Sequence, residues 1–153
     1  MLSLLRFAWH TFIAPILKRP KSLQMAALCH RGCGDHKEYL LVTSRGTRRW
    51  IIPKGWPIRG LKSNETALRE AWEEAGVINS LATDKPIGSY IYKKTQANGF
   101  ELAVETLVYS VAVKEMSEHF PEEDQRRLKW VDAETAADLV SEVGLKSIIR
   151  NFK

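Results

Sequence analysis

The chain has 153 residues, enough for one ordinary globular domain with a substantial core. Hydrophobic residues make up 44% and charged residues 27%, close to the globular average, which argues against disordered and fibrous classes. The formal net charge of +5 favours anionic partners such as phosphates, nucleic acid or an acidic membrane surface. Two cysteines are too few for a disulfide scaffold and suit a reducing compartment, so we expect a cytoplasmic location.

The first 22 residues differ from the rest of the chain, because they are largely apolar and end in a basic cluster. The apolar run is too short and too interrupted to span a bilayer as a helix. A secretory signal would carry its positive charge before the apolar run, whereas here the charge follows it. We expect residues 1–22 to form an N-terminal helix or arm packed on the domain. The alternatives are a segment in peripheral contact with a membrane surface and a poorly ordered leader.

From Leu23 onward, short β-like runs alternate with turn signals, and the domain is expected over residues 23–153. In chain order, strands are predicted over residues 23–30, 39–44, 50–52, 87–93, 100–113 and 129–131. Turns are predicted over residues 31–35, 45–47 and 95–99, an irregular loop over 53–60 and an acidic loop over 119–124. The pattern of short strands and turns predicts a sheet that contains antiparallel pairs.

Helical patterns follow the irregular loop and the last predicted strand. The first helix is predicted from about Asn64 to Ala75, with Ser63 as its N-cap and Gly76 as the left-handed residue that ends it. Glu65 lies in its first turn, where a carboxylate favours the helix dipole. Further helices are predicted from Asp132 onward and over residues 145–152. Strands mixed with helices in one domain indicate the α+β class, with a helix on at least one face of the sheet.

The first predicted helix carries a cluster of carboxylates. Glu70, Glu73 and Glu74 stand at i, i+3 and i+4, which places all three on one face of the helix. The apolar residues fall on the opposite face: Leu68, Ala71, Trp72 and Ala75. Mg²⁺ prefers oxygen ligands and completes its shell with water and substrate phosphates, so this face is a candidate metal site. A solvated glutamate-rich surface is the alternative interpretation.

The loop before this helix is rich in glycine, proline and basic side chains. A glycine such as Gly55 lets backbone approach a ligand closely, and Lys54 and Arg59 can reach anionic oxygens. Further basic residues lie on either side of the loop: Arg45, Arg48, Arg49 and Lys62. Together they favour a highly anionic substrate, whereas each of them alone is a common surface residue.

Here the sequence resembles the Nudix family, whose box is written G-x5-E-x7-R-E-U-x-E-E-x-G-U, where U is a bulky aliphatic residue. The chain matches the box at Gly55, Arg69, Glu70, Glu73, Glu74, Gly76 and Val77. It departs from the box at two positions: Leu61 replaces the first glutamate, and Ala71 replaces a larger aliphatic residue. Residues 41–55, 73–77 and 129–131 are similar to the branch that contains diphosphoinositol polyphosphate phosphohydrolases.

The resemblance implies an α/β/α sandwich with a mixed central sheet, and hydrolysis of an organic diphosphate with Mg²⁺ or alternatively Mn²⁺. It implies that Glu70, Glu73 and Glu74 are the metal ligands and that Arg69 orients them through ion pairing. Glu73 and Glu123 are the candidates for the general base, with Glu122 beside the latter in the acidic loop. Lys54, Gly55, Arg48 and Arg59 are the expected substrate-binding residues.

The sequence therefore predicts hydrolysis of a phosphoanhydride bond in a small anionic substrate, such as a diphosphoinositol polyphosphate or a dinucleoside polyphosphate. Two alternatives stay open. One is a Nudix-fold module that binds a phosphorylated ligand without hydrolysing it, which Leu61 favours. The other is a pyrophosphohydrolase that acts on the 5′ end of RNA, although nucleic acid is not the favoured partner. The oligomeric state is left open.

Overall fold

The computed structural model describes residues 22–152. The predicted N-terminal arm, with its proposed packing or membrane contact, therefore lies outside the described residues except for Ser22, which is part of a strand. Within residues 22–152, no helix combines the length and the apolar character that crossing a bilayer requires.

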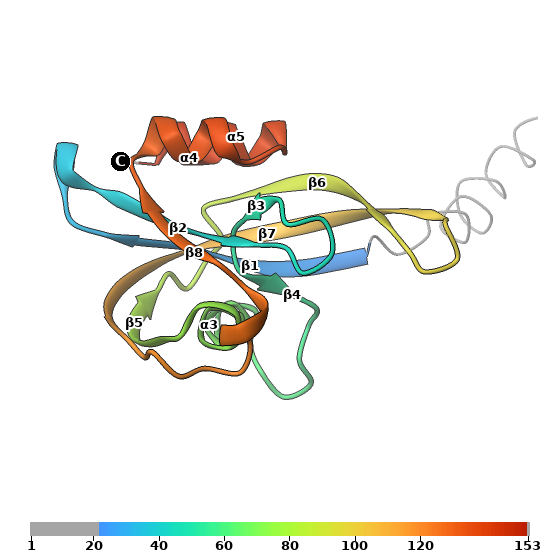
Figure 1. The fold of residues 1–153 in the computed structure, drawn as a ribbon, viewed down its shortest axis with the longest axis horizontal. Coiled ribbons are helices and arrows are strands. Elements are labelled where there is room, and N and C mark those ends of the chain that lie inside the picture. The colour runs from blue at the N-terminus through green and yellow to red at the C-terminus, as the bar shows by residue number, and fades with distance from the viewer. Residues whose placement is uncertain (1–21, 153) are drawn as a thin grey trace, which may run out of the picture.

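A mixed sheet of eight strands forms the centre of the molecule (Figure 1). The strands are β1 (Ser22–Arg31), β2 (Glu38–Thr43), β3 (Trp50–Ile51), β4 (Lys54–Gly55), β5 (Val77–Ala82), β6 (Gly88–Thr95), β7 (Glu101–Met116) and β8 (Leu128–Val131). The main order is β3-β2-β1-β7-β5, while β4 pairs with β1, β6 with β7 and β8 with β2. Strands β1 and β7 run parallel, with Ser22 opposite Val104, and the other strand pairs are antiparallel.

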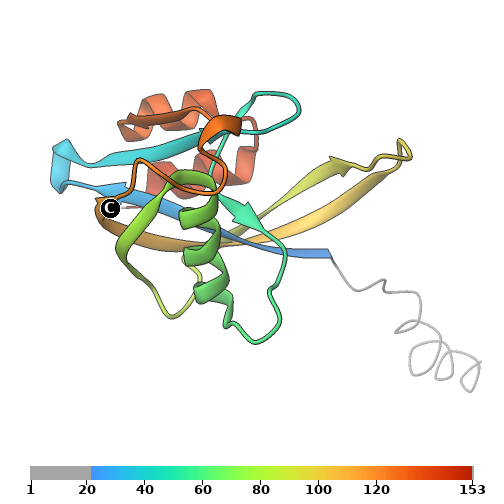
Figure 2. The ribbon, with the colours of Figure 1, turned by 60° about the horizontal axis from the view of Figure 1, so that its bottom comes forward.

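Helices cover both faces of this sheet (Figures 1 and 2). Helix α3 (Ser63–Ala75) lies on one face, and α4 (Ala133–Leu139) and α5 (Val143–Asn151) lie on the other. Successive side chains of a strand point to opposite faces, so the apolar run of β1 serves both cores. Leu28 packs on the side of α4 and α5, whereas Ala27 packs on the side of α3. The predicted α+β class and the sandwich with a mixed sheet are confirmed.

All six predicted strands are present with small shifts of their ends, and two further strands were not predicted. Strand β4 lies inside the loop expected to be irregular, where it pairs with β1 so that Gly55 faces Met25. Strand β5 follows α3 directly and pairs with β7 through an irregular register. Its sequence alternates poorly, and it exposes Ile78 and Leu81, because it lies at an edge of the sheet.

The ends of α3 are fixed by local hydrogen bonds. The predicted N-cap Ser63 is wrong by one residue, since Lys62 holds that position and its N–H donates to Glu65 Oε2 over 2.7 Å. At the other end Gly76 adopts a φ of 74°, which confirms its predicted role in ending the helix. A Cβ at Gly76 would overlap the Ser117 carbonyl oxygen, so this glycine also lets the next loop lie against the helix.

Of the two C-terminal helices, α4 has a side-chain cap and α5 has none. Asp132 accepts a hydrogen bond from the Thr135 N–H at 2.9 Å and caps α4, as expected from the sequence. Helix α5 begins at Val143, earlier than the predicted Leu145. The acidic loop contains a short 3₁₀ turn, η3 (Glu123–Gln125), which determines where its carboxylates lie.

Candidate active site

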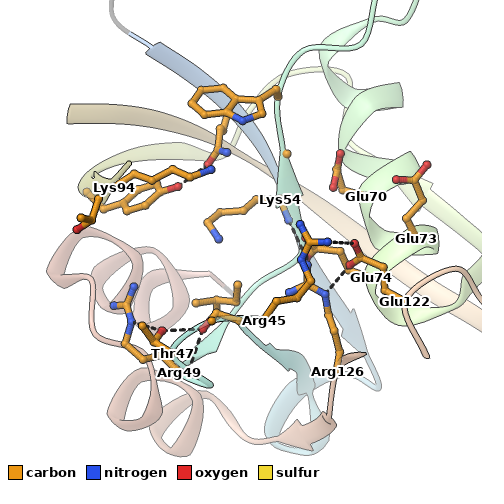
Figure 3. Close-up of a pocket in the computed structure, with 18 of the residues that line it drawn as sticks. Arg45, Thr47, Arg49, Lys54, Glu70, Glu73, Glu74, Lys94, Glu122 and Arg126 are labelled. Carbon is orange, nitrogen blue, oxygen red and sulfur yellow. Dashed lines mark hydrogen bonds and ion pairs between the residues drawn. The ribbon is translucent and has the colours of Figure 1, made fainter. Parts of the chain in front are cut away.

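A cleft of about 840 Å³ lies between α3, the loops that flank β3 and the end of β6 (Figure 3). One wall carries carboxylates from α3, which we call the acidic wall: Glu70, Glu73 and Glu74. The other side carries basic residues from separate segments, which we call the cationic wall: Arg45, Arg49, Lys54, Lys93 and Lys94. Opposite charges face one another across the space where a ligand would lie.

Helix α3 presents its acidic wall because its other face is anchored in the core. Ala67, Ala71 and Ala75 are fully buried against the sheet, which fixes the rotation of the helix. All three predicted carboxylates line the same cleft, as the i, i+3, i+4 spacing indicated. Their exposure is unequal, since the Glu73 side chain is 38% exposed and that of Glu74 only 7%.

Glu74 belongs to a buried ionic network that sequence reasoning missed. Its Oε1 lies 2.6 Å from Nη2 of Arg126, and its Oε2 accepts the Lys54 N–H at 3.3 Å. Arg126, whose side chain is 5% exposed, also donates to Glu122 Oε2 at 2.6 Å and to the Thr43 carbonyl at 2.9 Å. One guanidinium therefore connects the helix, the acidic loop and β2.

Burial shifts the ionisation of several groups in the cleft. It raises the pKa of Glu74 to about 7, although the charges of Arg126 and Lys54 oppose the shift. It also raises the pKa of Glu70, with the neighbouring Glu73 charge adding to the effect. Burial lowers the pKa of Lys54, against the opposing pull of Glu74. The acidic wall thus resists carrying its full negative charge without a cation.

Gly55 is required by the approach of α3 to β4. A Cβ at this position would overlap the carboxylate of Glu70, so any larger residue would push that side chain aside. Pairing of β4 with β1 fixes the backbone at the same point. The space beside this glycine is taken by a candidate metal ligand, and its predicted approach to a bound substrate stays a prediction.

Leu61, which replaces the first glutamate of the box, does not line the cleft. It lines a shallow, mostly apolar groove on the outer side of α3 together with Leu68 and Trp72. Trp72, expected on the apolar face, is only partly buried there. Glu65 does not take the place of the missing glutamate in the cleft, because its carboxylate accepts the Lys62 N–H at the start of the helix.

The donor chemistry of the acidic wall suits a hard divalent cation, but the three carboxylates do not converge. Within residues 22–152, no group of three or more His, Cys, Asp or Glu side chains is arranged to enclose a metal ion. Glu70 and Glu73 face the cleft, whereas Glu74 is engaged by Arg126. Mg²⁺ needs only one or two carboxylates when water and phosphate oxygens complete its shell, so the residues fit such an ion.

Four other predicted site residues lie outside the lining of the cleft. Arg48 adopts a φ of 55° and donates to the Gln125 carbonyl at 3.0 Å. Arg59 is exposed to solvent. Arg69 lies 4.0 Å from Glu73, as expected for an ion pair, but it stacks over Trp72 on the outer side. Glu123 contacts His119 at 3.2 Å, and Glu122 lines the cleft in its place.

The cationic wall contains two arginines that the sequence indicated only as part of a basic group, and lysines from β6 that were not assigned to the site. Arg45, Arg49 and Lys94 line the cleft, and Lys94 lies 4.9 Å from the centroid of the exposed Trp56 ring. The basic stretch at residues 45–49 was the sequence signal for the first two. No local pattern indicated Arg126, because its role depends on contacts with Glu74 and Glu122.

The mixed sheet covered by helices on both faces, with a carboxylate-lined cleft beside α3, is the architecture of a Nudix-type domain. Comparison with known families agrees. The model of the NUDIX domain family matches residues 23–152. This chain belongs to the Nudix family.

Curated relatives from Arabidopsis thaliana support this membership. The chain is 25% identical to Nudix hydrolase 4 over 115 residues, which covers 75% of this chain and 53% of the relative. It is 27% identical to the chloroplastic Nudix hydrolase 21 over 122 residues, which covers 79% of this chain and 59% of the relative. The chain thus spans between half and two thirds of the length of these relatives.

Solved structures share the fold at low sequence identity. A Caenorhabditis elegans Ap4A hydrolase aligns with a TM-score of 0.61 at 18% identity, covering 86% of this chain and 95% of that structure. The NUDIX domain of Shewanella oneidensis NrtR, solved in complex with ADP ribose, aligns with a TM-score of 0.63 at 15% identity, covering 93% of each chain. These similarities establish the fold.

Proposed function

We propose that this protein hydrolyses a phosphoanhydride bond in a small, highly anionic, diphosphate-linked substrate. The observation that carries the proposal is the single cleft in which the acidic wall faces the cationic wall. A substrate with adjacent phosphates matches this arrangement, because its charge can be neutralised from both sides. The relatives named as Nudix hydrolases and the structure named as an Ap4A hydrolase support the same class of reaction.

In this proposal, Glu70, Glu73 and Glu74 hold Mg²⁺ or Mn²⁺. Such an ion would supply charge neutralisation at the phosphates and an activated water molecule for the attack. Lys54 and Arg49 bind phosphate oxygens from the opposite side of the cleft. Glu73 is the candidate to accept a proton, because its side chain is 38% exposed and lines the cleft. Glu122, which also lines the cleft, is the second candidate.

Diphosphoinositol polyphosphates and dinucleoside polyphosphates are the proposed substrates, because both carry the dense negative charge that the cationic wall suits. The similarity to the diphosphoinositol polyphosphate phosphohydrolase branch stays a hypothesis. A peripheral membrane contact through residues 1–22 and a cytoplasmic location are likewise proposals. Liposome binding with and without residues 1–22 tests the first, and fluorescence localisation of the full chain tests the second.

Turnover of a substrate panel with Mg²⁺ tests the proposal. The panel contains dinucleoside polyphosphates, inositol pyrophosphates, ADP-ribose and triphosphorylated RNA. We expect Glu73→Gln to lower kcat by at least about 100-fold, the scale of losing a group that acts in the transition state. Glu118→Gln, the same exchange outside the cleft lining, serves as the matched control. Unchanged turnover in Glu73→Gln would contradict the assignment.

A binding module without hydrolysis is the second candidate, and the bond between Arg126 and Glu74 favours it. While this bond is intact, one of the three carboxylates is engaged by a protein cation. Such a module would bind a substrate of the panel at the cleft and release no product with Mg²⁺ or Mn²⁺. Product release that depends on Glu73 would exclude it.

A further inference from the structure

Glu142 lies behind the cationic wall, and its burial calls for a partner. This residue immediately precedes α5, and its side chain is only 8% exposed. Its Oε1 lies 3.5 Å from Nη1 of Arg49, whereas its Oε2 is buried and makes no hydrogen bond within the described part of the chain. Burying a carboxylate oxygen without a partner is costly, so a residue of this kind needs a compensating role.

Two backbone features hold Glu142 at this place. The segment before α5 forms a bridge to β3 between Val140 and Trp50. The first turn of α5 lies directly against β6, because a Cβ at Gly144 would overlap the Tyr90 side chain. Glu142 is therefore fixed between two elements whose neighbouring residues, Arg49 and Tyr92, line the cleft.

The charge of Glu142 acts on the cations of the cleft from behind. Together with burial, its negative charge raises the pKa of Tyr92, a residue of the cleft lining. The Lys54 ammonium makes no hydrogen bond or ion pair within residues 22–152, and it lies 5.6 Å from the centroid of the Tyr92 ring. Arg49 and Lys54 line the cleft, whereas Glu142 lies behind them and does not line it.

Arg49 and Lys54 are arranged for phosphates beyond the bond at the acidic wall. Figure 3 shows the Lys54 side chain reaching into the middle of the cleft, and Arg49 across the cleft from Glu70 and Glu73. Arg49 is further held by Thr47, whose Oγ1 accepts from its Nε at 3.2 Å. A phosphate bound by both cations would be separated from the acidic wall, so a chain of more than two phosphates would use the whole cleft.

We propose that Glu142 is a positioning residue that holds Arg49, so that Arg49 and Lys54 together form a site for the distal phosphates of a polyphosphate chain. The inference rests on the proposed function, because it names the kind of substrate that the same cleft selects. Of the two proposed substrates, this site favours dinucleoside polyphosphates with chains of three or more phosphates over diphosphoinositol polyphosphates, whose chains end at two. Glu142 itself touches no substrate in this arrangement.

Binding of inorganic tripolyphosphate and pyrophosphate by calorimetry, in buffer stripped of divalent cations, tests the inference without turnover. We expect the wild type to bind tripolyphosphate more tightly than pyrophosphate, and Glu142→Gln to weaken tripolyphosphate binding about tenfold. The sign is decisive, because removing a negative charge near the cleft would by itself strengthen the binding of an anion. Glu134→Gln, the same exchange at an exposed residue of α4 paired with Arg150, should leave both affinities unchanged.

A second comparison protects the test against misfolding. If Glu142→Gln does not fold, Glu142→Asp keeps the charge but shortens the reach to Arg49, and it should weaken tripolyphosphate binding in the same direction. In an Arg49→Gln background, the Glu142 exchange should have a smaller effect than in the wild type, because the two residues act together.

Each outcome bears on one proposal. Tripolyphosphate affinity that is unchanged or stronger in the folded Glu142 variants would overturn the inference, as would a wild-type protein that binds no tripolyphosphate. An inactive substrate panel with intact, Glu142-dependent tripolyphosphate binding would overturn the proposed hydrolysis and leave this site standing.

Discussion

The two walls of the cleft differ in how the chain builds them. The acidic wall comes from one helix, where three carboxylates share a face through their spacing and the alanines behind them. The cationic wall is assembled from separate segments, and its residues meet only when β3, β4 and β6 have joined the sheet. The first wall is a property of local sequence and the second a property of tertiary structure, so different changes should damage them.

Removing the arginine that joins the acidic wall to the rest of the molecule should have the largest effect on stability. Arg126→Met leaves Glu74 and Glu122 without their shared cation in a buried place. We expect the free energy of unfolding to fall by about 3–5 kcal/mol near pH 8, where Glu74 is charged, measured by urea denaturation. Arg127→Met, at the exposed neighbouring arginine, should change stability by less than about 0.5 kcal/mol. Equal losses in both variants would contradict the network.

Two glycines of the same motif should separate folding from activity. Gly76→Ala places alanine in the left-handed region and in a clash with the Ser117 carbonyl. We expect the free energy of unfolding to fall by about 1–3 kcal/mol, measured by thermal or urea denaturation.

In Gly55→Ala, the new Cβ meets only the flexible end of the Glu70 side chain. It should cost less than about 1 kcal/mol of stability but lower activity about 100-fold, by displacing that carboxylate. Full activity of Gly55→Ala would show that the position of Glu70 is not critical.

The raised pKa of Glu74 should make the metal-free protein lose stability as pH rises. The folded state holds the Glu74 proton up to a pH of about 7, whereas the unfolded state releases it near the ordinary glutamate pKa. Between these two values the folded state binds more protons, so the free energy of unfolding falls with pH, by up to about 1.4 kcal/mol per pH unit. Urea denaturation at a series of pH values should show this fall of the free energy of unfolding in the wild type. The fall should be smaller in Glu74→Gln, because glutamine does not titrate.

The ion pair on the outer side of α3 should matter least for stability. Arg69 and Glu73 are 4.0 Å apart and both substantially exposed. Arg69→Gln should therefore change the free energy of unfolding by less than about 0.5 kcal/mol, measured by urea denaturation at low and high salt. A larger, salt-insensitive loss would mean that Arg69 braces the acidic wall more strongly than the distance indicates.

Local patterns in the sequence predicted most strands of the sheet and the acidic wall of the cleft. The turn residues and apolar runs located six strands, and the spacing of Glu70, Glu73 and Glu74 located the acidic wall. Strand β5 was not predicted, because an edge strand with a bulged register has little alternation to detect. Arg126 was not predicted either, since nothing near it in the sequence shows that a glutamate of α3 lies against it.

The same reasoning explains the errors in choosing among similar side chains. Arg48 and Arg49 are adjacent, but the left-handed backbone at Arg48 directs it to Gln125 while Arg49 lines the cleft. Glu122 and Glu123 are adjacent as well, and the 3₁₀ turn that begins at Glu123 leaves Glu122 at the cleft. The sequence indicated the correct loop for each pair. The backbone conformation of the loop determines which residue of the pair lines the cleft.

The parallel pairing of β1 with β7 has a consequence for how the molecule folds. The central ladder joins Ser22 to Val104 and continues to His30 and Ala112, so its two strands come from distant parts of the chain. Closing so long a loop costs entropy before any pairing rewards it, and contacts of this kind slow folding. On the ribosome, β1 can pair with β2 early, but its parallel ladder with β7 can form only after β7 has emerged.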